Sequence, residues 1–141
     1  MGQLKKEKDV TVRITTVADG ESFVTESAGE YGRDGEVHCV AYTERHDGDV
    51  TRSGLQLRRD ALLLHRDGAV SSQMLFAEGH TTKAVYKAYG LDSEFLVQTH
   101  QYDVLFGEDR ITVDLRYTLM ESEGAPGSDF RLEIEIVDRP L

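Results

Sequence analysis

The chain has 141 residues, of which 39% are hydrophobic and 30% charged, and this is sufficient apolar material for a single folded domain over residues 1–141. Its formal net charge of −10 at pH 7 argues against nucleic acid and anionic membranes as partners, because both are bound through clustered Lys and Arg side chains. No apolar run follows the N-terminal charges as in a secretory signal, and none approaches the roughly 20 residues of a membrane span. We therefore expect a cytoplasmic protein.

Alternation of apolar and polar residues begins near the N-terminus. In DVTVRITTV (9–17), Val10, Val12 and Ile14 share one face, which predicts a half-buried antiparallel strand. Further strands are expected at 22–31, 36–44 and 50–59. The turns between them contain Asp-Gly pairs, which supply the left-handed backbone conformation that a tight hairpin requires.

The second half of the chain continues the same pattern. Strands are predicted at 61–66, 69–78, 81–89, 93–102, 110–122 and 130–137. Residues 81–89 contain Ala and Lys, which favour a helix, but Val85, Tyr86 and two threonines favour a strand. About ten segments with turns every 8–12 residues are typical of an all-β meander that closes into an antiparallel up-and-down barrel. The interior of such a barrel either fills with side chains or holds one small ligand.

Four stretches spread over the chain carry a family resemblance: KDVTVRITTVADGE (8–21), HRDGAVSSQMLFAEG (65–79), VYKAYGLDSEFLVQT (85–99) and FRLEIEI (130–136). They resemble the bacterial YwiB-like family, also known as the domain of unknown function 1934. The strongest matches are Arg66, Gly68, Ser72, Gln73, Met74, Phe76, Tyr86, Tyr89 and Gly90. The resemblance implies an eight-stranded, lipocalin-like (calycin-like) barrel in an intracellular bacterial protein, and it implies no established activity.

The stretch from 70 to 77 is the first candidate for a ligand site. Alternation places Val70, Ser72, Met74 and Phe76 on the more apolar face. If this face points into the barrel, Ser72 is a polar contact in an apolar pocket whose wall includes Met74 and Phe76. Alternatively, Ser72 bonds to neighbouring backbone and Met74 only fills space.

Three further side chains are candidate ligand contacts near the barrel rim. Arg66 precedes the turn at Asp67 and Gly68, where its guanidinium could pair with a carboxylate of the protein or hold a ligand carboxylate. Tyr86 and Tyr89 offer aromatic faces and hydroxyls, although tyrosines on strands often belong to the edge of a core.

The sequence favours neither catalysis nor metal binding. The single Cys39 lies in a strand-like stretch, where a cysteine packs as a small hydrophobe more often than it reacts. The five histidines have no metal-motif spacing, although His38 and His100 could approach each other across a sheet. Asp114, Glu133 and Glu135 alternate with apolar residues, as on a solvated strand face. We therefore expect no catalytic residue, metal or cofactor.

The leading hypothesis is a cytosolic barrel that binds a small, partly apolar molecule in its lumen. The alternative is a structural or interaction module without ligand chemistry, such as a homodimer joined through an edge strand or an exposed apolar face. A third hypothesis is an unrecognised enzyme that acts on a small molecule.

Overall fold

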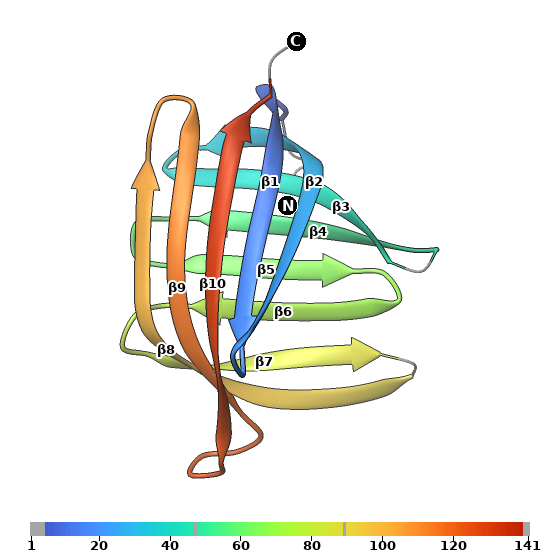
Figure 1. Ribbon diagram of the computed structural model, residues 1–141, viewed down its shortest axis with the longest axis vertical. Coiled ribbons are helices and arrows are strands. Elements are labelled where there is room, and N and C mark those ends of the chain that lie inside the picture. The colour runs from blue at the N-terminus through green and yellow to red at the C-terminus, as the bar shows by residue number, and fades with distance from the viewer. Residues whose placement is uncertain (1–4, 47, 89, 140–141) are drawn as a thin grey trace.

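The computed structural model describes residues 5–46, 48–88 and 90–139, and within them ten strands form one closed antiparallel barrel (Figure 1). This confirms the predicted up-and-down barrel, since each strand pairs with its sequence neighbours and β1 pairs with β10. The ten strands match the ten predicted segments and exceed the eight that the resemblance implied. They are β1 (Lys8–Ala18), β2 (Glu21–Asp34), β3 (Val37–His46), β4 (Asp49–Leu57), β5 (Leu62–Asp67), β6 (Val70–Phe76), β7 (Thr81–Ala88), β8 (Leu91–Phe106), β9 (Arg110–Met120) and β10 (Gly127–Asp138).

Alternation along each strand decides which side chains fill the barrel. Val10, Val12 and Ile14 of β1 are buried, whereas Arg13 between them is exposed. The same alternation holds on β9 and β10, as the sequence predicts. Burial of this many aliphatic and aromatic side chains supplies the main stabilising free energy of the fold. The buried members on these two strands are Ile111, Val113, Leu115, Tyr117, Leu132, Ile134 and Ile136.

The strands form two groups that cross each other. In Figure 1, β1, β2, β9 and β10 run along the long axis, and β3 to β7 run across it. β8 belongs to both groups, because its first part pairs with β7 and its second part with β9. The register of β8 on β9 shifts between Thr99 and Gln101, and such a bulge bends a strand. The bend allows β8 to run over 16 residues, further than the predicted 93–102.

Residues 81–88, whose composition mixes helix-favouring and strand-favouring side chains, form β7. This strand pairs with β8 along its whole length and with β6 through residues 85–88. The strand prediction is confirmed, because strand pairing and the burial of Ala84 outweigh local helix propensity. The described residues include no helix long and apolar enough to cross a lipid bilayer.

The first hairpin turn shows why the sequence places Asp-Gly there. Asp19 and Gly20 have φ angles of 52° and 76°, and the flanking residues Ala18 and Glu21 pair directly. Positive φ at both central residues is the signature of the two-residue type I′ turn, whose twist matches that of the strands it joins.

β2 and β3 separate over part of their length, and this separation creates an opening in the barrel wall. β2 pairs with β1 through residues 21–31 but with β3 only through residues 29–34. The split begins at Gly29, where an added Cβ would lie 3.0 Å from the Ala41 carbonyl oxygen and 3.1 Å from Val12 Cγ2. The absence of a side chain at Gly29 therefore allows β2 to lie close to its neighbours immediately before it departs from β3.

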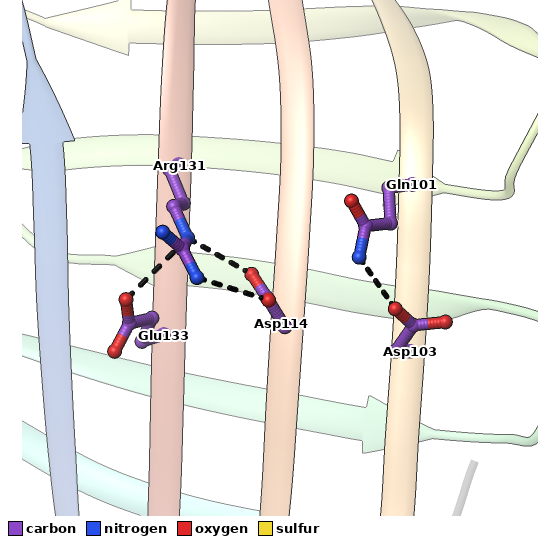
Figure 2. A network of polar contacts seen from close by, with 5 residues as sticks. All are labelled: Gln101, Asp103, Asp114, Arg131 and Glu133. Atoms are coloured by element: carbon purple, nitrogen blue, oxygen red, sulfur yellow. Dashed lines mark hydrogen bonds and ion pairs between the residues drawn. The ribbon is translucent and has the colours of Figure 1, made fainter.

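The outer face of β8, β9 and β10 carries the carboxylates that the sequence assigns to a solvated strand face. Figure 2 shows Arg131 donating two hydrogen bonds of 3.1 Å to Asp114, with its Nε also 3.4 Å from Glu133. On β8, Gln101 donates to Asp103. Of these contacts, the one between Arg131 and Asp114 joins β10 to β9 on the solvent side, whereas the other two lie within single strands.

Candidate ligand-binding site

An apolar layer fills the part of the lumen that lies toward the turn between β4 and β5. Leu57, Leu62 and Phe76 are directly opposite one another on β4, β5 and β6, and each is 0% exposed. The Phe76 ring lies 4.8 Å from the Tyr117 ring, which stacks on Phe130 at 5.2 Å. This layer is packed with side chains, so space for a ligand lies on either side of it.

A row of polar side chains crosses the inner face of five neighbouring strands. Along each strand, this row lies two residues away from the nearest row of apolar side chains. Its members are paired in register, each directly opposite the next: Tyr42 (β3), Ser53 (β4), Arg66 (β5), Ser72 (β6) and Tyr86 (β7). Directly opposite residues on neighbouring strands are roughly 5 Å apart at their Cβ atoms. We call these five residues the polar row.

The structure brings together three of the predicted site residues. Arg66, Ser72 and Tyr86 are cross-strand neighbours in the polar row, on three consecutive strands. Met74 is half-buried on the same face of β6, opposite Leu64, and Phe76 belongs to the packed layer beyond it. The face whose orientation the sequence leaves open points inward, since Phe76 is 0% exposed and Leu75, which belongs to the opposite face, is 40% exposed. Tyr89 lies outside the described residues.

Arg66 pairs with a carboxylate of the protein, one of the two roles that the sequence leaves open. Its Nε lies 3.4 Å from Glu44 Oε1, and Ser53 donates a 3.0 Å hydrogen bond to the same oxygen. Glu44 is not among the residues that the sequence nominates. In EVHCVAYTE it follows Val40 and Tyr42 at a spacing of two, so a charged residue on an otherwise apolar face is the signal that could have found it.

Two hydroxyls beside this ion pair are buried without a hydrogen-bond partner. They belong to Tyr42 and Ser72, and both residues are less than 9% exposed. The expected alternative, in which Ser72 bonds to neighbouring backbone, is therefore absent from the described part of the chain. Burial and then the charge of Glu44 raise the pKa of Tyr42 to about 12, against smaller lowerings by the charge of Arg66 and by the polar side chains of Ser53 and Arg66 beside the hydroxyl. Tyr42 is consequently a hydrogen-bond donor at neutral pH.

The opening between β2 and β3 leads to Glu44 and Arg66, whereas Tyr42 and Ser72 belong to the same row as Arg66 but do not line the opening. A cavity of about 780 Å³ lies there, and Glu44 and Arg66 line it together with Ser27, Thr51 and Val70. Further along the row, Tyr86 is 40% exposed, and its ring meets Phe95 edge-on at 6.4 Å. The arrangement provides polar donors next to apolar and aromatic surface, the composition of a small-molecule pocket.

The other candidates from the sequence have separate surroundings. His38 Nδ1 lies 2.6 Å from the Tyr31 hydroxyl, whereas His100 Nε2 lies 2.6 Å from Thr118 Oγ1. Cys39 is half-buried, and burial raises the pKa of its thiol. In the described ranges, no three His, Cys, Asp or Glu side chains form a group that could hold a metal ion.

The fold and the polar row define a closed antiparallel meander barrel with hydrogen-bonding groups set into one end of an apolar interior. The model of the family described as "Domain of unknown function (DUF1934)" matches residues 9–134, and the chain belongs to this family. Among solved structures, the ywiB protein from Bacillus subtilis is similar, with 21% identity over 97% of this chain and 96% of that chain and a TM-score of 0.83. At this identity the likeness shows the fold alone. No curated protein matches the chain.

Proposed function

We propose that this barrel binds a small, partly apolar molecule whose polar group enters through the opening between β2 and β3 and contacts the polar row. The observation that carries this proposal is the pair of buried, unpartnered hydroxyls of Tyr42 and Ser72. An unsatisfied buried polar group costs roughly 1–3 kcal/mol, and nearly all such groups in folded proteins have a partner. A ligand that accepts hydrogen bonds from both hydroxyls would remove this cost.

The apolar part of the ligand has its own surface. Met74 is half-buried beside the polar row, and Val70 lines the opening. Phe76, two residues from Met74 on the same face of β6, is fully buried, and the ring of Tyr86 at the end of the row is exposed. In this arrangement the hydroxyls of Tyr42 and Ser72 and the guanidinium of Arg66 orient the ligand, while burial of its apolar body supplies most of the affinity.

A panel of ligands that share an apolar body tests the proposal. The panel contains octanoate, octanamide, octanol, octylammonium and the phenyl analogues of each, and the readouts are the shift in melting temperature and the Kd from isothermal titration calorimetry. At least one class should bind the wild type. The variants Tyr42→Phe and Ser72→Ala should each weaken that binding by about fivefold to tenfold, the loss of one hydrogen bond.

Ser71→Ala is the matched control, because Ser71 is the neighbour of Ser72 on the same strand but faces the opposite side of the sheet. It should leave the Kd unchanged. The proposal is wrong if no class in the panel binds, or if binding is equally strong in Tyr42→Phe, Ser72→Ala and Ser71→Ala.

The free edge of β2 favours a second candidate, an interaction module that forms a homodimer. Residues 21–28 of β2 have no partner on the side of the opening, and Phe23 and Val24 in this segment are 58% and 52% exposed. An unpaired strand edge with apolar side chains is a template for pairing with a second copy. Sedimentation velocity over a range of concentrations tests this candidate, and a monomer at every concentration would exclude it.

A further inference from the structure

Two of the charges at the opening between β2 and β3 are paired with each other. Arg66 and Glu44 are 3.4 Å apart, and the charged side chains that line the cavity are two carboxylates and two guanidinium groups: Glu26, Glu44, Arg45 and Arg66. The side chains of Arg66 and Glu44 are only 32% and 26% exposed, so solvent screens their interaction less than it would at the surface. At Arg66 a ligand therefore meets a neutral ion pair rather than a free cation.

The position of the unpartnered hydroxyls adds to this argument. Tyr42 and Ser72 are buried in the same row as Arg66, and both can donate a hydrogen bond to an uncharged acceptor. A ligand carboxylate in this row would lie close to Glu44, which Ser53 and Arg66 already hold in place. Like charges in a half-buried site repel strongly, whereas a carbonyl oxygen meets no such repulsion.

We propose that the site selects an uncharged ligand, an apolar molecule with a carbonyl-type acceptor such as an amide, ester or ketone, and that Glu44 excludes the corresponding carboxylate by neutralising Arg66. This inference rests on the proposed function and specifies the chemical class of its ligand. Glu44 is thus a specificity residue. It makes the site selective through repulsion of the wrong ligand as well as attraction of the right one.

Octanamide and octanoate test the inference, because they share an apolar body and differ in charge. Calorimetric titration of the wild type should give a Kd for octanamide at least tenfold lower than that for octanoate. Glu44→Gln removes the carboxylate and leaves Arg66 free to bind an anion, so this variant should bind octanoate more tightly than octanamide. Glu26→Gln is the matched control, since Glu26 lines the same cavity without contacting Arg66, and it should keep the preference of the wild type.

Arg66→Gln provides a second variant in case Glu44→Gln does not fold. It removes the cation and retains Glu44, so it should bind octanamide within about threefold of the wild type and bind octanoate more weakly still. The inference is overturned if the wild type binds octanoate or octylammonium as tightly as octanamide, or if Glu44→Gln keeps the amide preference. If no member of the panel binds the wild type, the proposed function itself fails, and that outcome is distinct from a carboxylate preference.

Discussion

The two ends of the barrel hold cavities of similar size but differ in how their polar groups are satisfied. At the end formed by the turn between β4 and β5, a cavity of about 800 Å³ is lined by Tyr31, His38 and Arg58, among others. The Tyr31 hydroxyl lies 2.6 Å from His38 Nδ1, and the Tyr102 hydroxyl donates a 2.6 Å hydrogen bond to the Arg58 carbonyl. In the polar row that reaches the opening between β2 and β3, in contrast, the hydroxyls of Tyr42 and Ser72 have no partner.

This difference teaches that volume alone does not identify the binding site. Burial and then the charge of Arg33 lower the pKa of His38, which favours a neutral imidazole in contact with Tyr31. Lys8 is likewise neutralised by Asp138 at 2.7 Å. The hydrogen bonds of Tyr31 and Tyr102 already stabilise the fold, whereas the hydroxyls of Tyr42 and Ser72 are buried without a partner, as is that of Thr99 on β8. Substitutions in the layer that separates the two ends, and of the hydroxyls at each end, test this comparison.

The largest effect is expected from Phe76→Ala. Phe76 is 0% exposed and packs against Tyr117, so its removal leaves a cavity between the two ends. The free energy of unfolding should fall by about 3–5 kcal/mol. Urea denaturation followed by circular dichroism measures this change, since the chain has no tryptophan. A loss below about 1 kcal/mol would mean that the layer is not packed as described.

The next effect is on stability at alkaline pH. Tyr42 ionises at about 12 in the folded state and at 10.0 when unperturbed, so the unfolded state releases this proton first. The free energy of unfolding should therefore fall as the pH rises from 10 to 12, by about 2–3 kcal/mol for this residue. Tyr42→Phe should lack this contribution. Equal pH profiles for the wild type and the variant would show that Tyr42 is not buried as a neutral phenol.

Two tyrosine substitutions compare the ends directly at neutral pH. Tyr102→Phe removes the donor to the Arg58 carbonyl and should cost about 1–2 kcal/mol of unfolding free energy. Tyr42→Phe removes a hydroxyl without a partner, and with it the cost of burying that group, so the stability should rise by about 1 kcal/mol. Urea denaturation of both variants measures the two changes in the free energy of unfolding. If Tyr42→Phe costs as much as Tyr102→Phe, the two ends do not differ in the way described.

The smallest effect is expected from Ser72→Ala, which removes the second unpartnered hydroxyl. The free energy of unfolding should rise, by up to about 1 kcal/mol, because the cost of burying this unpartnered hydroxyl is removed. Ser53→Ala is the contrasting variant. Ser53 donates to Glu44, so its removal should cost about 1 kcal/mol in the same denaturation measurement.

Local alternation predicted the architecture well, because the period of two is written into each strand separately. The ten segments, the more apolar face of β6 and the aliphatic faces of β9 and β10 could all be read without knowledge of the strand partners. The extension of β8 to 16 residues could not be predicted from alternation alone, because the bulge at the register shift between Thr99 and Gln101 arises only when β8 pairs with β9.

The sequence by itself determined the apolar faces of β1, β9 and β10. It nominated Ser72 from the alternation along β6, Arg66 from its place before a turn, and Tyr86 from its aromatic ring and hydroxyl. Only the tertiary structure decided that these three residues share one row with Tyr42 and Ser53, that β2 leaves β3 to create an opening, and that Glu44 neutralises Arg66. The physical reason is that side-chain direction is a local property of an extended backbone, whereas register and strand separation depend on pairing between segments distant in the chain.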